Sequence, residues 1–594
     1  MHARGAVAAS ALVALLVVLS RIFPGAGPHA QPNKQVQVAG IPADRLAAWL
    51  PGLNAVGGIP HRAVVCATVN AAAYGNGLRN AATGIQAAIN ACPDGQVVQL
   101  SDGEFRIDNT ILLNKSITLR GRGPALTWLK MPRGKNDNLI TIGAAHWATP
   151  GQTVDLAKSG VRGSSSVTLA RDLKLGIGEI VLVDQLTDNE LNFWGYGCQP
   201  NDACRTWNTR PDRPLGQMLE VASVDGNIVT FTTSLHIDFK TSRGAQLSRF
   251  IDNSNNRVLA RVSYAGVEDL HLSGGGHGNI KMEAAAYSWI KGIESTDHTG
   301  TSVGLFKTFR SIVRDSYIHT ARAPVPGGGA YGIAVSDYAS DNLVENNIVL
   351  RMNKVMLMQA AGGGNVIGYN YMDDGLIEYQ PEWTESGINA SHMTGTHFAL
   401  FEGNQSFNYD AENVWGSPIY ITVFRNHLTG KRRSAPPLKL PSDQFRRTVS
   451  LWEGAWWHTL VGNVLGYEGM SPQPRAKRFA YEGFYPWDED PSPLWMVGIS
   501  KDWGPPDRKV AETLIRGGNY DYVSNQVRWE NLRESDLPKS LYLTSKPEFF
   551  GSYEWPWVNP TGSTKLHTLP ARARFDAGTP FASPPAGGKT SSGQ

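Results

Sequence analysis

The sequence predicts an all-β fold, a single-stranded right-handed parallel β-helix in which short strands coil into a solenoid. The main observation is a pattern of apolar residues followed by Asn, which recurs between residues 262 and 470. That stretch lacks the amphipathic helices of about 10 to 15 residues that a doubly wound α/β domain would need between its strands. A chain of 594 residues is also long for one compact core, whereas solenoid coils pack only on their neighbours.

The recurring asparagines define the repeat. They are Asn347, Asn370, Asn404, Asn426 and Asn463, separated by 23, 34, 22 and 37 residues. The short separations match one coil of three strands of about five residues with their turns, and the long ones match a coil that carries a loop insertion. Asn tolerates the left-handed backbone of a turn. We therefore predict that these side chains point inward, bond one another from coil to coil and have a structural role.

Residues 1–30 have the pattern of a signal peptide. Arg4 supplies a positive charge, an apolar run covers residues 6–19, and small residues lead to Ala30. The run of about 14 residues is shorter than the roughly 20 that a membrane span needs. We expect a secreted protein, extracellular or periplasmic, with no membrane span in the mature chain; an uncleaved membrane anchor is the alternative. Residues 31–62, rich in Pro, Gly and Ala, are predicted to be a linker.

Residues 63–150 are predicted to hold an N-terminal capping helix and the first coils. Thr83 and Gln86 have the spacing of a helix capping box, and apolar residues follow with helical periodicity until Pro-Asp-Gly at residues 93–95. Short strands separated by turns come next. The run 83–123 resembles the opening of pectin-lyase-like β-helix proteins, most closely the rhamnogalacturonase and epimerase-like pectate lyase group. This resemblance implies that the helix covers the open end of the solenoid, where a strand edge would otherwise be exposed.

The rest of the chain divides into three parts. Residues 151–250 contain alternating strands and a hairpin signal, Asp-Gly-Asn at 225–227, and are predicted to form an inserted antiparallel β subdomain. Residues 251–470 are predicted to carry the remaining coils. Residues 471–594, rich in Pro and Trp, are expected to cover the far end of the solenoid or to lie along its side, and to finish in a disordered tail.

The four cysteines suit an exported protein, because disulfide bonds persist in oxidising compartments. Cys198 and Cys204 bracket a polar turn and could form one bridge, and Cys66 and Cys92, which flank one short segment, make the natural second pair. Three pairings are possible, and the spacing does not choose among them. A metal site is not favoured, because the sequence has no Cys-x-x-Cys or His-rich spacing.

The largest loop insertion, predicted at residues 371–397, is the first place to seek catalytic groups, because functional residues concentrate on loops held by a rigid scaffold. Its candidate catalytic residues are Asp373, Asp374, Glu378, His392 and His397. Glycoside hydrolysis needs two carboxyl groups, and crowding of carboxylates raises one pKa, as a general acid requires. The histidines are predicted to assist as acid–base groups. A solvated acidic loop, or one that binds a structural cation, is the alternative.

A second set of candidates is basic or aromatic. Arg351 is a further candidate catalytic residue, and Arg351, Lys354 or His392 could act as the base of a β-eliminating lyase or an epimerase. Such a lyase also needs a cation that neutralises the uronate carboxylate. The candidate substrate-binding residues are Trp383, Trp415, Tyr379, Asp337, Lys354 and Trp194. The alternative for each basic residue is a solvated surface charge.

The catalytic pattern of one related group does not carry over. Polygalacturonases of this superfamily have Asn-Thr-Asp, Asp-Asp, Gly-His-Gly and Arg-Ile-Lys segments in that order. Asp373 and Asp374 match the pair, but the Gly-His-Gly segment, residues 276–278, precedes it, and the other two segments are absent. The resemblance is therefore specific for the fold of residues 63–470 and not for the reaction.

These observations predict a secreted enzyme that cleaves glycosidic bonds in a polysaccharide, with a glycoside hydrolase favoured. The alternatives are a polysaccharide lyase or epimerase acting on uronate-containing polymers, and a non-catalytic carbohydrate-binding β-helix. No cofactor or metal is expected, except calcium if the enzyme is a lyase. A net charge of +3, from 55 basic and 52 acidic residues, gives no sign of a nucleic-acid partner, and we expect a monomer.

Overall fold

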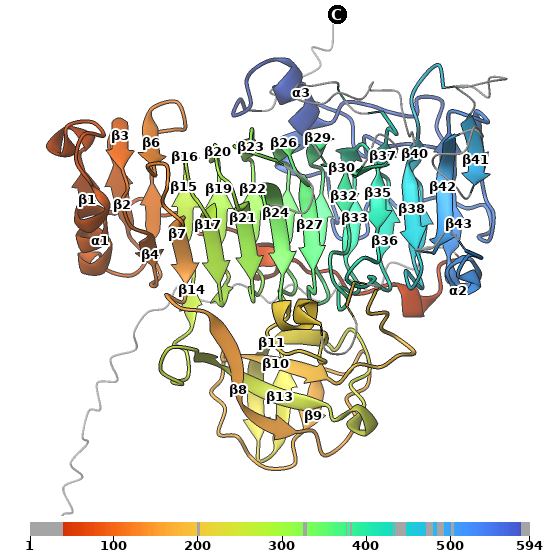
Figure 1. Ribbon diagram of the computed structural model, residues 1–594, viewed down its shortest axis with the longest axis horizontal. Helices are drawn as coiled ribbons and strands as arrows, with labels where there is room; N and C mark the ends of the chain where they lie inside the picture. The colour runs from red at the N-terminus through yellow and green to blue at the C-terminus, as the bar shows by residue number, and fades with distance from the viewer. Residues whose placement is uncertain are drawn as a thin grey trace, which may run out of the picture.

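The computed structural model describes residues 40–583, apart from 196, 199–201, 325–328, 376, 380–382, 386, 432, 434–446, 471–478, 484–491 and 501–503. The main body of this part of the chain is a solenoid of parallel strands whose coils stack along the long axis (Figure 1). A typical coil contributes one strand to each of three long sheets, which we call A, B and C in their order along the coil. The predicted parallel β-helix is confirmed.

The strands of each sheet follow one another in spatial order. Sheet A contains β1 (Val65–Val69), β2 (Val97–Leu100), β5 (Thr118–Arg120), β15 (Gly266–Glu268), β19 (Trp289–Lys291), β22 (Ile312–Arg314), β25 (Leu343–Glu345), β28 (Val366–Gly368), β33 (Leu400–Glu402), β36 (Thr422–Phe424), β39 (Thr459–Val461) and β43 (Ile515–Gly517). Sheet B contains β3 (Gly103–Arg106), β6 (Thr127–Lys130), β16 (His271–Ser273), β20 (Glu294–Thr296), β23 (Tyr317–His319), β26 (Ile348–Met352), β29 (Tyr371–Gly375), β34 (Gln405–Ser406), β37 (His427–Leu428), β40 (Val464–Leu465), β44 (Asn519–Asp521) and β45 (Gln526–Arg528). Sheet C contains β4 (Ile111–Leu113), β7 (Asn138–Gly143), β17 (Gly278–Glu283), β21 (Thr301–Phe306), β24 (Tyr331–Ser336), β27 (Met356–Gln359), β32 (Ile388–Asn389), β35 (Tyr409–Ala411), β38 (Val449–Trp452), β42 (Ser492–Ile499) and β41 (Phe479–Gly483). Two short pairs complete the solenoid, β14 (Val262–Ser263) with β18 (Ala285–Ala286) and β30 (Ile377–Tyr379) with β31 (Trp383–Glu385).

A ladder of asparagine side chains runs through the buried turns between sheets A and B. Asn347 Nδ2 donates to Asn370 Oδ1 at 3.0 Å, and the same bond links Asn370 to Asn404 and Asn404 to Asn426. The ladder continues through Asn463 to Asn519, with side-chain bonds of 3.2 and 3.0 Å. Each Oδ1 also accepts the backbone N–H of the preceding asparagine at 2.9 to 3.0 Å. The prediction of inward, stacked asparagines is confirmed.

A helix, α1 (Ala82–Ala91), lies against the first strands, at the N-terminal end of the solenoid (Figure 1). Ile85 and Ile89 bury its apolar face in the main core. The capping box differs from the sequence prediction, because the N-cap is Ala81 and its side chain has no oxygen to cap the helix. Gln86 instead bonds the edge of β4, with Leu112 N donating to its Oε1 at 2.8 Å and its Nε2 donating to Leu112 O at 3.0 Å.

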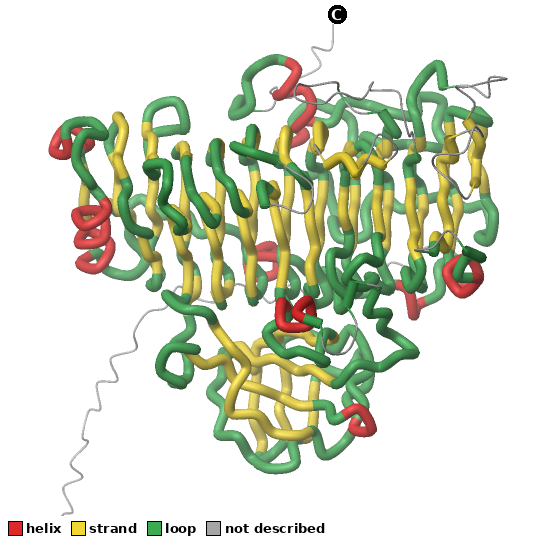
Figure 2. The backbone as a smooth tube through the Cα atoms, in the orientation of Figure 1, coloured by secondary structure: helices red, strands yellow, loops and turns green. Residues whose placement is uncertain are grey.

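Residues 148 to 252 form a six-stranded antiparallel sheet beside the solenoid. Its spatial order is β8 (Ala148–Asp155), β13 (Gln246–Asp252), β10 (Ile180–Gln185), β11 (Leu215–Asp225), β12 (Ile228–Phe231) and β9 (Ser166–Thr168). It lies below the coils in the view of Figure 2, and it has a core of its own that includes Val183, Leu219 and Leu247. Its bonds to the turns that lead from sheet C to sheet A include Tyr338 OH, which donates to Arg213 O at 2.9 Å, and Met218 N, which donates to Ser340 Oγ at 3.0 Å.

Both predicted disulfide pairs are present, Cys66–Cys92 and Cys198–Cys204. The first joins β1 to the end of α1, so it ties the helix to the first coil. The second closes a short loop between β10 and β11. These pairings settle the choice that the spacing left open.

Residues 40–56 differ from the predicted linker. They contain η1 (Ala43–Arg45) and η2 (Gly52–Val56), and they pack along the solenoid. Trp49 Nε1 donates to Phe398 O at 3.0 Å, and Gly52 N donates to Asp341 O at 2.7 Å. The reason lies in apolar side chains among the Pro and Gly residues: Trp49 and Leu53 are 3% and 0% exposed. The part of the predicted linker before residue 40, and the predicted signal peptide, lie outside the described residues.

The solenoid continues beyond the predicted boundary at residue 470. β43 pairs with β39 and β44 pairs with β40, so a further coil forms after a long insertion that includes α2 (Arg508–Thr513). Residues 532–577 then lie along the side of the solenoid, one of the two placements expected, with η6 (Glu548–Phe550) and α3 (Pro570–Asp576). Arg425 holds this segment through three carbonyl groups, those of Leu537, Pro538 and Val558, at 2.6 to 3.0 Å. Within the described residues, no helix has the length and apolar character to span a bilayer.

Candidate active site on the outer face of sheet C

Sheet C changes character along its outer face. Leu357, Asn389, Asp410 and Ser450 are register partners on β27, β32, β35 and β38. The neighbouring residue Ile388 belongs to the main core. Because successive side chains of a strand point to opposite faces, the row from Leu357 to Ser450 points outward. The row becomes polar at Asn389, so the candidate site is sought on the sheet C strands β32, β35 and β38.

Three side chains meet beside this row, and we call Lys354, His392 and Glu412 the charged cluster. They come from the segments that precede β27, follow β32 and follow β35. Lys354 Nζ donates to Glu412 Oε1 at 2.9 Å, and His392 Nδ1 lies 2.7 Å from the same oxygen. The side chains of Lys354 and Glu412 are 2% and 3% exposed, whereas that of His392 is 16% exposed. Within the cluster, the imidazole is therefore the group that a substrate can reach most easily.

The electrostatics of the cluster determine the proton positions. Burial raises the pKa of the Glu412 carboxyl, but Lys354 and His392 lower it more, so the net pKa falls well below its ordinary range. An ionised carboxylate can only accept hydrogen bonds, so the proton of the short contact belongs to His392 Nδ1. Burial, followed by the ammonium group of Lys354, lowers the pKa of His392. The imidazole is therefore neutral near pH 7, with the lone pair of Nε2 available to take a proton.

A second carboxyl group, that of Asp410, stands next to the cluster on β35, two residues before Glu412. Asp410 accepts from Arg447 at 2.8 Å, and both residues are at most 2% exposed. Burial raises the pKa of Asp410 despite the opposing effect of Arg447, and the charge of Glu412 adds to the rise. Asp410 and Glu412 thus have pKa values displaced in opposite directions, as neighbouring acid and base groups often do in active sites.

The aromatic ring of Tyr331 completes this side of the cluster. Tyr331 is the first residue of β24, and its ring centroid lies 6.3 Å from that of His392, at an interplanar angle of 66°. A phenol can both donate and accept a proton. The Tyr331 ring therefore lies edge to face with the neutral histidine.

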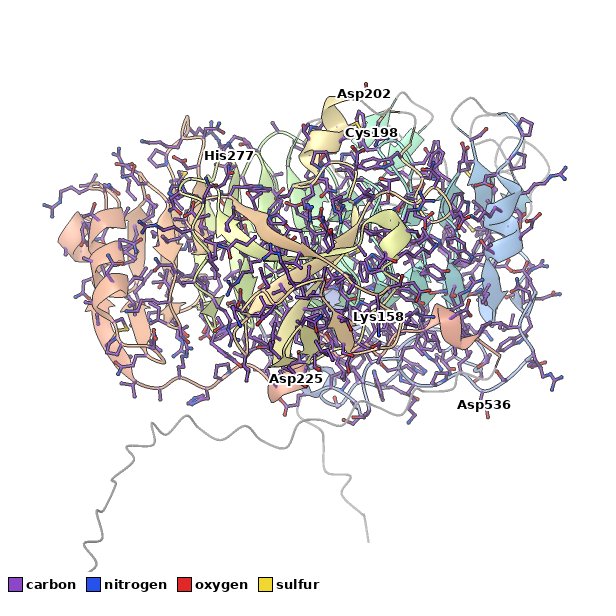
Figure 3. The ribbon with its side chains drawn as sticks, turned by 90° about the horizontal axis from the view of Figure 1, so that it is seen from below. Lys158, Cys198, Asp202, Asp225, His277 and Asp536 are labelled. Atoms are coloured by element: carbon purple, nitrogen blue, oxygen red, sulfur yellow. A yellow bond between two sulfur atoms is a disulfide. The ribbon has the colours of Figure 1, made fainter. Side chains whose placement is uncertain are left out.

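The loop between β10 and β11 forms a wall near the cluster. Gly197 N donates to Val414 O at 2.9 Å, and a Cβ on Gly195 would lie 1.7 Å from Asn413 O, so this close approach requires glycine. The rings of Trp207 and Trp415 meet at 4.8 Å, and Trp207 is 47% exposed. Figure 3 shows Cys198 and Asp202 of this loop on the same side of the solenoid as His277. The disulfide-braced loop therefore places aromatic rings next to the strand that leads to Glu412.

Asp337 and Trp194, two predicted substrate-binding residues, help to hold this loop. Asp337 accepts from Lys307 Nζ at 2.5 Å and from Thr209 N at 3.2 Å, and the Thr209 hydroxyl also donates to it. Trp194 Nε1 donates to Thr187 Oγ1 at 3.0 Å, and the guanidinium of Arg205 lies 4.4 Å from the indole centroid. Both side chains are partly or fully buried, and these contacts attach the loop to the solenoid and to itself.

Asp373 and Asp374 lie on a different sheet from the charged cluster. They belong to β29 of sheet B, so the loop insertion begins after them rather than including them. Asp373 accepts from Tyr371 OH at 3.3 Å and from Asp374 N at 2.7 Å. Burial raises the pKa of Asp373, and its charged neighbours are Arg572 and Arg433. The structure therefore brings together Lys354 and His392 from the predicted residues, but not this acidic pair.

The other predicted residues are spread more widely. Glu378, Tyr379 and Trp383 lie in the β30–β31 hairpin, and their side chains fall outside the described part. Arg351 is exposed on β26. His397 is fully buried near the subdomain, where Nδ1 donates to Gly395 O at 2.7 Å and burial lowers its pKa to about 4. These positions do not converge with the charged cluster on any described contact.

Sequence reasoning missed Glu412, Asp410, Arg447 and Tyr331. A usable signal was present in Tyr-Asp-Ala-Glu at 409–412, where acidic residues alternate with core residues a few positions after the rung Asn404. Alternation of this kind puts both carboxyl groups on one face. This segment is a regular strand rather than a loop insertion, so the loop insertions do not point to it. Among the described residues, no three His, Cys, Asp or Glu side chains are placed to hold a metal, so calcium stays a prediction.

Comparison with known proteins leaves the reaction open. No family model matches the chain, and no curated protein matches it. Among solved structures, a tailspike protein from Pseudomonas phage LKA1 has 14% identity and a TM-score of 0.46, with 66% of this chain and 58% of that chain covered. The A-module of a mannuronan C-5 epimerase from Azotobacter vinelandii has 12% identity and a TM-score of 0.33, with 66% and 87% covered. A pectate lyase has 9% identity and a TM-score of 0.33, with 64% and 69% covered. The chain thus spans 58% of the length of the tailspike it matches.

Proposed function

We propose that this protein acts on an acidic polysaccharide by removing the proton next to a uronate carboxylate, as a lyase or an epimerase does. The observation that carries the proposal is the contact between His392 Nδ1 and the ionised Glu412, with Lys354 on the same oxygen. This contact holds the imidazole in the tautomer whose Nε2 can accept a proton. A base positioned in this way typically contributes about 10²- to 10⁴-fold in rate.

The remaining groups supply what proton abstraction needs. Removal of the proton at C5 of a uronate leaves negative charge that spreads onto the carboxylate, and a nearby cation stabilises it. Lys354 supplies a cation at this point, and its pairing with Glu412 fixes its position. The ring of Tyr331 lies beside that of His392, and we assign its phenol to donate or return a proton. In a lyase the C4–O bond then breaks, a C4–C5 double bond forms and the leaving oxygen takes a proton; in an epimerase C5 is reprotonated from the other face.

Hydrolysis is the second candidate, because Asp410 and Glu412 have pKa values displaced in opposite directions. Two residues of a strand advance about 6.6 Å, which falls within the roughly 6.5 to 9.5 Å between the carboxyl groups of inverting glycosidases. This second route uses a carboxyl pair that the sequence analysis did not select. It ranks lower because Asp410 is held by Arg447 and Glu412 by Lys354 and His392, so neither carboxyl is free to move.

The products distinguish the reactions. The purified chain would be incubated with uronate-containing and neutral polysaccharides, with reducing ends and ultraviolet absorbance followed together. A lyase yields both signals, since its product carries a new C=C bond, whereas a hydrolase yields reducing ends alone. An epimerase changes the uronate composition with neither signal. Turnover of neutral polymers only would contradict the proposal, and the absence of all three changes with binding retained would leave a non-catalytic carbohydrate-binding protein.

A further inference from the structure

A separate pocket opens on the outer face of sheet C, nearer the N-terminal end than the charged cluster. Its volume is about 160 Å³, and β7, β17 and β21 form its base. The side chains that matter for the argument are Trp147, His277, Lys281 and Phe306. A pocket of this size is smaller than the roughly 300 Å³ at which drug-sized sites begin. It suits one sugar unit of a chain rather than a whole oligosaccharide.

The floor and the wall of this pocket are aromatic. A Cβ on Gly304 would lie 2.5 Å from Cε2 of Phe306, so the absence of a side chain at Gly304 lets the Phe306 ring lie across the strand. Trp147, the residue before β8, lies 5.8 Å from Phe306 between ring centroids and is 37% exposed. Exposed aromatic rings with one wet edge favour binding of partly apolar ligands such as the faces of sugar rings. Trp147 is also where the chain leaves the solenoid for the subdomain, so the insertion positions this wall.

Charge in the pocket favours an anionic ligand. Lys281 Nζ lies 2.9 Å from Glu283 and 4.7 Å from the Trp147 centroid, and 19% of its side chain is exposed. Glu283 and Lys307 are fully buried, and Lys307 Nζ lies 3.4 Å from the Trp147 centroid. The carboxylate of Glu283 is therefore covered, while Lys281 and the exposed His277 border the opening.

The pocket and the charged cluster share one sheet face. The strand order is β17, β21, β24, β27, β32 and β35, and neighbouring strands lie about 4.8 Å apart. The pocket on β21 is therefore roughly 10 Å from β27 and roughly 19 Å from β35 along the solenoid axis. A polymer that lies along this axis can occupy both places at once.

We propose that the pocket formed by Trp147, Lys281, His277 and Phe306 is a remote subsite that binds a uronate unit of the same polymer whose reacting unit lies at the charged cluster. This proposal rests on the proposed function for the substrate class. It assigns a function to the Gly-His-Gly segment at 276–278, which the charged cluster does not use. It also predicts that the protein binds long chains better than short ones.

The test measures binding without turnover. Trp147→Ala and Lys281→Gln would each be combined with His392→Ala, and the dissociation constants for alginate and oligogalacturonate oligomers of two and eight units would be measured by calorimetry. The matched controls are Trp128→Ala and Lys130→Gln, because Trp128 is 39% exposed and Lys130 is 55% exposed, and both lie on β6 of sheet B. Thermal unfolding of each variant shows whether it folds, and Trp147→Phe tests whether an aromatic ring restores binding.

The subsite predicts a clear pattern. Trp147→Ala and Lys281→Gln should each weaken binding of the eight-unit oligomer about tenfold, which is about 1.4 kcal/mol. Binding of the two-unit oligomer should stay within about twofold. Trp147→Phe should recover most of the lost affinity for the eight-unit oligomer. Carboxyl-reduced octamers should lose the dependence on Lys281. Equal octamer affinity in the Trp147→Ala and Trp128→Ala proteins would overturn the subsite, even if the enzyme turns over uronates. Binding of octamers that depends on Trp147, without turnover by the wild-type protein, would instead overturn the proposed function alone.

Discussion

The outer faces of sheets A and C differ although both belong to the same coils. On sheet A the outward row includes Trp289, Ile312, Leu343, Val366 and Leu400, and all are buried beneath residues 40–56 or 532–577. On sheet C the corresponding row becomes Asn389, Asp410 and Ser450. The sheet C row is also buried, at no more than 2% exposed, but it is polar, and Asp410 pairs there with Arg447. The outward row of sheet A thus contributes apolar packing under a covering segment, whereas that of sheet C holds paired polar groups beside the charged cluster.

Buried acids show the same contrast. On sheet A, Glu402 accepts from Leu541 N at 2.8 Å and from Tyr369 OH at 2.9 Å, and burial raises its pKa to about 7. Neither of these two hydrogen bonds to the Glu402 carboxyl comes from a lysine or a histidine. On sheet C, Glu412 pairs with Lys354 and His392, and its pKa falls. A carboxyl that fastens a covering segment and one that orients a base therefore have opposite pKa shifts.

The largest expected effect comes from breaking the sheet C cluster. His392→Ala should reduce kcat on a uronate polymer about 10³-fold, because it removes the proposed base, and Glu412→Gln about 10²-fold, because it removes the acceptor that fixes the tautomer. Initial rates at saturating polymer measure both. The wild-type acid limb of kcat/KM should titrate below the ordinary histidine value of 6.5, since burial lowers the pKa of His392.

The control for this prediction is a buried acid of the other face. Glu345 lies on sheet A and accepts from Tyr542 OH at 2.8 Å. Glu345→Gln should leave kcat within about twofold of wild type, because the amide oxygen can still accept that bond. If Glu412→Gln and Glu345→Gln had the same kcat, the distinction between the two faces would fail.

The second prediction concerns stability in acid. Burial lowers the pKa of five histidines to about 3 or 4, namely His236, His298, His397, His427 and His458. Between pH 6 and 5 these groups are charged only in the unfolded chain, so the unfolded state binds more protons and stability falls as pH falls. Asp341 and Glu402, with pKa values raised to about 7, bind protons in the folded chain and oppose the trend. Because the five histidines outnumber the two carboxyls, the free energy of unfolding should fall by roughly 3 kcal/mol for each pH unit of acidification between pH 6 and 5.

Calorimetric unfolding between pH 7 and 5 tests this balance. A Tm that stays constant over this range would show that the histidines are not buried as neutral groups. The double variant Asp341→Asn and Glu402→Gln removes the opposing carboxyls and should make the loss of Tm in acid steeper. An unchanged slope in that variant would contradict the assignment of raised pKa values to these two acids.

Much of the solenoid could be predicted from the sequence because its rungs are local and repeated. The Asn ladder needs an amide at each turn, and the recurrence of Asn370, Asn404 and Asn426 showed it directly. The sequence did not predict that Asn519 belongs to the ladder, because the long insertion before it interrupts the regular spacing of the asparagines. The sequence predicts a linker for residues 40–56 because of their Pro, Gly and Ala content. Four of their apolar side chains are buried, and this burial depends on sheet A strands that are distant in sequence.

The site was harder to predict because it is assembled across coils. Lys354 and Glu412 are 58 residues apart and meet only because two coils place them side by side. Sequence reasoning looked for many carboxylates in one loop, which led to Asp373 and Asp374 on sheet B. It named His392 and Lys354 as separate alternatives and had no means to join them through Glu412. Such contacts depend on the register in which the coils stack. The sequence spacing of the repeats defines this register only approximately when coils carry insertions.

The third prediction concerns the segment, residues 532–577, that covers the outer face of sheet A. Arg425→Met should leave three carbonyl groups of the covering segment without their donor, at a cost of about 2 to 4 kcal/mol. Limited proteolysis should then cut residues 532–577 faster, while turnover of the uronate polymer at low temperature stays within about twofold. Arg122→Met is the matched control, because the Arg122 side chain is 62% exposed. Equal proteolysis of the two variants would mean that Arg425 does not hold the cover.

The smallest effect is expected from loss of the Cys198–Cys204 disulfide in the loop between β10 and β11, which we call the wall loop. The Cys198–Cys204 bridge spans 6 residues and the Cys66–Cys92 bridge spans 26, so their loss should cost about 2 and about 4 kcal/mol by loop entropy. Replacing Cys198 and Cys204 with Ser should raise KM about threefold with kcat unchanged, because the loop places Trp207 against Trp415. Replacing Cys66 and Cys92 with Ser should instead lower Tm with KM unchanged, because that bridge lies at α1, far along the solenoid from the charged cluster. A larger KM change in the second variant than in the first would show that the wall loop does not border the bound polymer.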